Sequence, residues 1–200
     1  MEKRTQNGFT LYELMITLLI VGVILSLGIP NMRAYSQNSR MTSAANDFHA
    51  TFHLARSEAS RAKTNITICA SADSLTCGVG ATWDQGYIVF VDTDGNIATG
   101  GADESILRAQ PAMPEGIFVA AADDSNYFSF AGTGLGRGIV NGDPKLLSRV
   151  VMCDERGNIT AAGGNSAARL FVATPLGRAT IQRDKGMIQT ALDDMGKSCP

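Results

Sequence analysis

The sequence predicts an α+β protein in which a long bent N-terminal helix, membrane-spanning in its first half, packs on a β-rich globular head. Three observations support this, the first being an apolar run from Leu14 to Ile29 that ends at Pro30. A helical pattern of apolar residues then resumes and continues to about Lys63. From Asn65 onward, short β-branched or aromatic runs are separated by Gly, Asp, Asn and Pro. Because these runs follow one helix, the class is α+β rather than α/β.

The composition suits one domain with an anchor. The chain has 200 residues, of which 21 are Gly and 18% are charged, and this favours a loop-rich β domain over a coiled coil or a disordered tail. The net charge of −2 gives no global attraction to nucleic acid. The charge is uneven, with eight acids and one base from Asp84 to Asp124 and six bases from Arg149 to Lys185. Solvated loops explain this asymmetry more simply than steering of a partner does.

The helix is predicted from Phe9 to Lys63 with a bend at Pro30, because proline kinks a helix interior. Beyond Pro30, apolar residues at steps of three and four form one face. This face comprises Met41, Ala45, Phe48, Phe52, Ala55, Ala59 and Ala62. Eight later runs are predicted as strands, at residues 65–70, 86–92, 105–110, 116–121, 126–131, 146–153, 169–174 and 177–183.

The N-terminus combines a short basic leader with Gly8, Phe9 and a lone acid, Glu13, at the start of the apolar run. Placing a carboxylate in hydrocarbon costs roughly 2.5–3.5 kcal/mol, so an acid at this position indicates a function. Counted from Phe9, the apolar segment has 21 residues, about the length that spans a bilayer. Lys3 and Arg4 precede it, which predicts a cytoplasmic leader and an exported remainder.

This arrangement resembles the class III signal of type IV pilins and type II secretion pseudopilins. The resemblance implies that a prepilin peptidase cuts after Gly8, that the new N-terminus at Phe9 is methylated, and that Glu13 pairs with the N-terminal amine of a neighbouring filament subunit. Tyr12 departs from the family, which usually has an aliphatic residue there. The alternatives are a plain signal anchor or a secretory signal peptide cut near Ala34, and both leave Glu13 unexplained.

A second resemblance covers most of the exported part. The segments that carry it, similar to the GspH/FimT family of minor pilins and pseudopilins, are Ala55–Ala59, Ile66–Cys69, Trp83–Asp92, Asp103–Arg108 and Leu176–Arg178. It implies a subunit of a type IV pilus or a type II secretion pseudopilus, near the filament tip. The implied partners are other pilins, the prepilin peptidase and the bacterial inner membrane, crossed once with the head in the periplasm. The expected segments are a leader at 1–8, a membrane-spanning half-helix at 9–30, an amphipathic half-helix at 31–64 and the head at 65–200.

Four cysteines in an exported domain predict two disulfides, for which three pairings are possible. Cys69 and Cys77 flank a short polar turn, and Cys199 lies in a tail that would fray unless a bridge to Cys153 held it. We therefore expect Cys69–Cys77 and Cys153–Cys199, with buried free thiols as the alternative. The spacing does not suit a zinc site.

The C-terminal stretch raises DNA capture during uptake as the alternative function. Some members of the family bind DNA through a C-terminal Gly-Arg-x-Arg motif, whereas this chain reads Gly-Arg-Ala-Thr at 177–180 and lacks the second Arg. The candidate phosphate contacts are Arg178, Arg183, Lys185 and Arg169. They can serve only if the strands bring them to one surface.

Two patterns suggest a metal. The segment Asp92–Asn96 resembles the opening of a calcium loop, but its Gly is fourth instead of sixth, and Asp103 stands where an EF-hand has Glu. A hairpin turn is therefore favoured, with calcium as the alternative. His49 and His53 lie four apart on the helix without an evident third ligand and are expected at the surface or its boundary. We predict no metal, no cofactor and, since no nucleophile–base–orienter set is present, no enzymatic activity.

Overall fold

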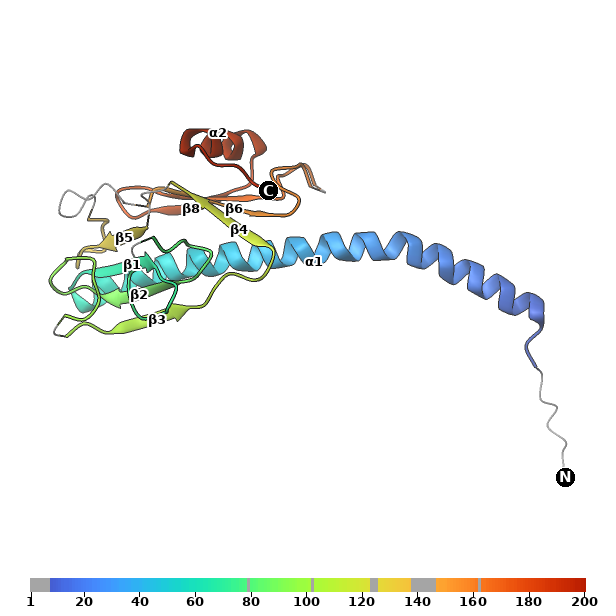
Figure 1. Ribbon diagram of the computed structural model, residues 1–200, viewed down its shortest axis with the longest axis horizontal. Helices are drawn as coiled ribbons and strands as arrows, with labels where there is room; N and C mark the ends of the chain where they lie inside the picture. The colour runs from blue at the N-terminus through green and yellow to red at the C-terminus, as the bar shows by residue number, and fades with distance from the viewer. Residues whose placement is uncertain (1–7, 79, 102, 123–125, 138–146, 162) are drawn as a thin grey trace, which may run out of the picture. The chain divides into compact units, whose positions relative to one another are not determined.

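The structure is a computed structural model that describes residues 8–78, 80–101, 103–122, 126–137, 147–161 and 163–200 (Figure 1). The predicted leader, apart from Gly8, and residue 146 of the sixth predicted strand lie outside these residues. The chain forms two compact units, one ending at Ser39 and the other spanning Arg40–Pro200. The boundary between them falls inside the half-helix predicted at 31–64, and the functional division of the chain stays a prediction.

Helix α1 spans Leu11–Ala62, close to the predicted range. Pro30 lies inside it, and the helix continues through the proline. Asn31 adds a hydrogen bond from its side chain to the carbonyl of Leu27 (3.0 Å) in this turn, where proline itself has no N–H to donate. Lys63 then adopts a left-handed conformation (φ 56°), a common way for a helix to end.

The head contains all eight predicted strands, each within three residues of its predicted bounds. They are β1 (Ile66–Ala70), β2 (Tyr87–Val91), β3 (Ile106–Gln110), β4 (Ile117–Ala121), β5 (Tyr127–Phe130), β6 (Arg149–Asp154), β7 (Arg169–Ala173) and β8 (Ala179–Gln182). They form two antiparallel four-stranded sheets, ordered β3-β2-β1-β5 and β4-β6-β7-β8. The predicted α+β class is confirmed.

The second half of α1 shares one hydrophobic core with the inner faces of both sheets. The ring of Phe52 lies 4.7 Å from that of Phe128 on β5 and 5.2 Å from that of Phe171 on β7. One helical side chain therefore contacts the first sheet and the second. The buried residues of this helix are Met41, Ala44, Ala45, Phe48, Thr51, Phe52, Ala55 and Ala59. The predicted face is confirmed except for Ala62, which is exposed at the last position of the helix.

The outer face of the second sheet is covered by α2 (Lys185–Met195), a helix that the sequence analysis did not predict (Figure 1). Side chains alternate along a strand, so Val151 and Leu170 point away from the main core and pack with Leu192 of α2. Asp184 caps the helix by accepting a hydrogen bond from a backbone N–H of its first turn (2.8 Å). Both faces of this sheet are therefore buried.

Candidate functional site

The N-terminal motif begins in open space and leads directly into α1. No atom lies within 4 Å of where a Cβ on Gly8 would stand, and Phe9 is 88% exposed. Thr10 and Glu13 then form a capping box. The backbone N–H of Thr10 donates to Oε2 of Glu13 (3.1 Å), and the N–H of Glu13 donates to Oγ1 of Thr10 (3.2 Å). The carboxylate of Glu13 thus helps to start the helix.

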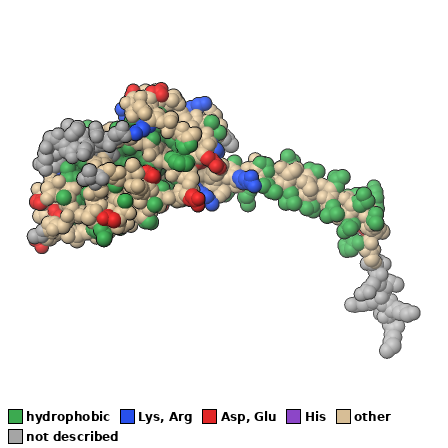
Figure 2. Space-filling view, in the orientation of Figure 1, with side chains coloured by type: hydrophobic (Ala, Val, Ile, Leu, Met, Phe, Trp, Pro, Cys, Tyr) green, Lys and Arg blue, Asp and Glu red, His purple; other side chains and the backbone are tan. Residues whose placement is uncertain are grey.

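The segment after Glu13 exposes apolar side chains on all sides. Every described residue from 8 to 36 is exposed, and Figure 2 shows hydrophobic side chains along the visible face of this helix. Its hydroxyls bond to the helix itself, since Thr17 donates to the carbonyl of Leu14 (2.9 Å) and Ser26 to that of Val23 (2.8 Å). By length and composition α1 could cross a membrane. None of the described residues of the first unit, 8–39, covers this surface.

The four candidate phosphate contacts do not form one surface. Arg169 is only 3% exposed, and its Nη1 donates to the carbonyls of Ser166, Ala167 and Ala168 at 2.8–3.1 Å. Burial, with smaller contributions from neighbouring Arg side chains, lowers the pKa of Arg169 to about 10. Its assignment as a DNA contact is therefore wrong, because the guanidinium is used to hold backbone carbonyls.

Of the other three candidates, Arg178 lies apart from Arg183 and Lys185, which are two residues from each other in the chain. Arg178 precedes the four-residue strand β8 and Arg183 follows it, which separates their backbones by roughly 16 Å. Arg178 is exposed, whereas the Nε of Arg183 is buried without a hydrogen-bond partner. Lys185 is exposed in the first turn of α2. This arrangement separates Arg178 from Arg183 and Lys185, whereas DNA binding needs several cations that converge on one surface.

The structure contains both predicted disulfides. Cys69–Cys77 links β1 to the loop that follows it, with Cα atoms 5.6 Å apart. Cys153–Cys199 links β6 to the end of the chain, with Cα atoms 5.7 Å apart. Cys199 also packs with the cluster beneath α2, so the C-terminal residues are held to the second sheet.

His49 and His53 face each other on α1, with their Nε2 atoms 3.2 Å apart. The Nε2 of His49 also lies 3.3 Å from the carbonyl oxygen of Ala179. Burial and the nearby His49 and Arg56 side chains lower the pKa of His53. In the described part of the chain, no further His, Cys, Asp or Glu completes a three-ligand group with this pair.

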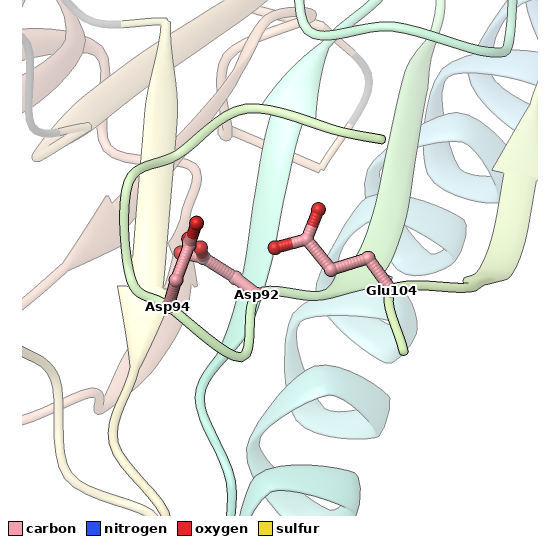
Figure 3. A group of neighbouring side chains, drawn as sticks. All are labelled: Asp92, Asp94 and Glu104. Atoms are coloured by element: carbon pink, nitrogen blue, oxygen red, sulfur yellow. The ribbon is translucent and has the colours of Figure 1, made fainter. Parts of the chain in front are cut away.

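A cluster of acids lies where β2 ends and β3 begins. Carboxylate oxygens of Asp92, Asp94 and Glu104 are within 4.8 Å of one another (Figure 3). The sequence pattern singled out the first two but placed Asp103 in the acidic position of the loop, whereas the structure places Glu104 there. Asp103 is exposed and does not belong to the cluster.

Two family models match the chain. The model described as the prokaryotic N-terminal methylation motif matches residues 3–29, and the one described as type II transport protein GspH matches residues 44–177. This chain belongs to the GspH family. The second match covers most of the head together with the half of α1 that packs on it.

Individual relatives of this GspH-family chain are more distant. Type II secretion system core protein G of Aeromonas hydrophila is 38% identical over 47 residues, which are 24% of this chain, and the chain spans a third of that relative's length. Two crystal structures of the type IV minor pilin FimU of Pseudomonas aeruginosa have TM-scores of 0.49 and 0.45, with 18% and 20% identity. They cover 76% and 70% of this chain and 94% and 91% of FimU, and the assignment does not rest on them.

Membership in the GspH family gives the broad function. As a member, the chain is pilin-like or pseudopilin-like, and the family is a structural class of minor subunits that assemble with other pilins in pili or secretion systems. The family is not enzymatic. Thr10 was not among the site residues predicted from the sequence. It could have been detected, because Thr three residues before Glu is the signature of a capping box.

Proposed function

We propose that this chain is made as a prepilin, cut after Gly8 by a prepilin peptidase and methylated on Phe9. The apolar half of α1 holds it in the bacterial inner membrane with the head in the periplasm. It then enters a type IV pilus or a type II secretion pseudopilus near the tip. One observation carries the proposal, namely that an apolar surface open on all sides begins directly after Gly8–Phe9 and has Glu13 in its first turn.

Glu13 can influence entry into the filament because the hydrophobic effect contributes little to that step. Lipid tails are about as apolar as leucine side chains, so moving the helix from a membrane into a bundle of similar helices gains little from apolar burial. Packing and polar pairing must then favour assembly. After cleavage the new amino group would belong to Phe9, one residue before the capping box, and a neighbouring subunit could present its own amine to Glu13.

Processing is tested by replacing Gly8 with valine in cells that contain the peptidase. The structure leaves space for the new side chain, so the fold should be unaffected, and a block would reflect the peptidase itself. We expect mass spectrometry to find the uncut chain in Gly8→Val and a cut, methylated Phe9 in the wild type. Gly28→Val is the matched control, because that glycine is also uncrowded and lies far from the bond. Normal cutting of Gly8→Val would refute the cleavage site.

The role of Glu13 is tested by separating its charge from its capping function. Glu13→Gln removes the charge but keeps a side chain that can complete a capping box, whereas Thr10→Ala removes the cap and keeps the charge. We expect Glu13→Gln to be cleaved normally but to be depleted from sheared filaments, with Thr10→Ala much less affected. Equal incorporation of Glu13→Gln and the wild type would remove the charge from the mechanism.

The tip position is tested by labelling the head. An epitope on the exposed loop residue Leu75 should mark filament ends in electron micrographs, while labelling along the shaft would contradict a tip subunit.

A further inference from the structure

The acid cluster of the head lies where the two ends of the long loop between β2 and β3 meet. Asp92 directly follows β2 and is fully buried, Asp94 lies two residues further on, and Glu104 stands just before β3. Figure 3 shows the carboxylate of Glu104 facing that of Asp92. Three anionic groups from both ends of one loop therefore meet at a single point.

Most oxygens of the cluster already accept hydrogen bonds. Oδ2 of Asp92 accepts from the hydroxyl of Thr67 (2.7 Å) and from Nη1 of Arg137 (3.3 Å), and its Oδ1 accepts one long bond from Ile97 N–H (3.3 Å). Both oxygens of Asp94 accept from Asn96 (3.0 and 2.8 Å). Asp92 and Asp94 each keep at least one lone pair free for a cation, since a carboxylate has about four acceptor positions.

Glu104 differs from the two aspartates. Its Oε2 accepts from the backbone N–H of Gly101 (2.7 Å), whereas its Oε1 is buried from solvent and has no hydrogen-bond partner. A buried carboxylate oxygen without a partner is costly and requires an explanation. This observation is independent of the clustering, and it leaves an acceptor next to two other acids without a donor to bind.

The charge of the cluster matches a divalent cation. Three carboxylates carry three negative charges, and among the described residues Arg137 is the base that bonds to one of them. Its guanidinium is also held by Ser129 Oγ and the carbonyl of Gly95, both at 3.2 Å. Two negative charges therefore remain uncompensated at the group.

We propose that Asp92, Asp94 and Glu104 bind a divalent cation, and that calcium is the ion that fits best. The ligands are all oxygens, which hard cations prefer. Calcium binds oxygen at about 2.3–2.6 Å, so its shell is about 4.6–5.2 Å across, whereas that of magnesium is only about 4.2 Å. The oxygens of the cluster all lie within 4.8 Å of one another, a separation that the calcium shell can span. Water and backbone carbonyls would complete it.

Cation binding at this point would fasten the start of the loop to its end. β2 and β3 are paired, and β3 is an edge strand of the first sheet. A calcium ion held by Asp92 and Glu104 would close the connection between them and would stabilise this edge of the head.

The test uses the full-length chain in detergent micelles, stripped with a chelator and titrated with calcium chloride by calorimetry. We expect one saturable site with a dissociation constant in the range of about 10⁻⁵ to 10⁻³ M and a higher thermal midpoint with calcium than with chelator. Glu104→Gln, which keeps the shape and can still accept from Gly101, should weaken binding at least about tenfold by losing the charge at the unpaired oxygen. Asp94→Asn, a change at an exposed residue, should weaken it similarly.

Asp103→Asn is the matched control, because it removes an acid one residue from Glu104 but outside the cluster, and it should bind calcium as the wild type does. The proposal is overturned if the wild type shows no saturable binding, or if Glu104→Gln retains wild-type affinity. It is also overturned if Asp103→Asn weakens binding as much as Glu104→Gln does, since the effect would then be general surface charge. Tighter binding of magnesium than of calcium would refute the choice of ion.

Discussion

The two halves of α1 belong to one helix but meet different surroundings. In the head, the helix buries one side against both sheets and keeps polar residues elsewhere, so that Phe52 is 1% exposed. In the described part of the N-terminal unit, apolar residues lie on every side of the helix and are left uncovered, so that Leu19 is 68% exposed. The same secondary structure therefore serves a closed core in one half and an unpartnered surface in the other.

This difference shows where the partners of each half come from. A one-sided apolar stripe can be satisfied by the chain's own sheets, because two packed layers bury it completely. A helix that is apolar all round needs a lipid or protein environment on every side. The head thus buries its own apolar side chains, whereas those of the N-terminal half are left for the membrane and filament contacts that we propose.

The sharpest test of the comparison exchanges one large side chain for alanine in each half. Phe52→Ala should lower the unfolding free energy by about 3–5 kcal/mol, because the cavity would lie between the two sheets. Leu19→Ala should leave it unchanged. Urea titration in micelles, followed by the fluorescence of Trp83, reports the head alone, since Trp83 is the single tryptophan and is buried there. Equal destabilisation by both variants would contradict the separation of the two halves.

Removing either disulfide of the head should lower the free energy of unfolding by a slightly smaller amount. Loop-closure arithmetic gives about 4 kcal/mol for Cys153–Cys199, with a sequence separation of 46 residues, and about 2.6 kcal/mol for Cys69–Cys77, with a separation of 8. Double serine variants at each pair should therefore be destabilised in this order. Denaturant midpoints under oxidising conditions measure it, with the reduced wild type as the control. A larger loss from the short loop would show that local packing outweighs chain entropy.

The smallest predicted effect is a pH dependence from His53. Its pKa is lowered in the folded head by burial, by His49 and by Arg56, so below the unfolded value of about 6.5 the unfolded chain binds more protons. The contribution of His53 to stability is therefore present above pH ~6.5 and is lost as the pH falls through its folded pKa. The difference in unfolding free energy between the wild type and His53→Gln, measured from about pH 7.5 to pH 5, should shrink on acidification. A constant difference would refute the lowered pKa.

The helix α2 shows how a detectable element was missed. Asp184 stands before a run in which Ile188, Ala191, Leu192 and Met195 recur at three- and four-residue steps, which is a cap followed by one apolar face. Two glycines flank the pattern, at 186 and 196, and glycine in a helix interior lowers its propensity. Packing on β6 and β7 overrides that preference, because the sheet would otherwise expose its outer apolar side chains.

Arg169 and Glu104 show what a linear pattern cannot provide. The spacing of basic residues made Arg169 a candidate phosphate contact, but no linear pattern indicated that it would be buried among three backbone carbonyls. Likewise, counting along a calcium loop led to Asp103, whereas the left-handed conformation of that residue (φ 66°) and the pairing of β2 with β3 bring Glu104 to the aspartates.

The sequence by itself determined the features that depend on order along the chain. These are the N-terminal motif with Gly8, Phe9 and Glu13, the apolar half-helix and the eight strands, because spacing and periodicity are local properties. The disulfide pairs were expected from the sequence, but only the structure decided among the three possible pairings. Only the tertiary structure decided which charged groups are buried and which meet. Such contacts join residues far apart in sequence, and burial is a property of the packed layers on both sides of a side chain.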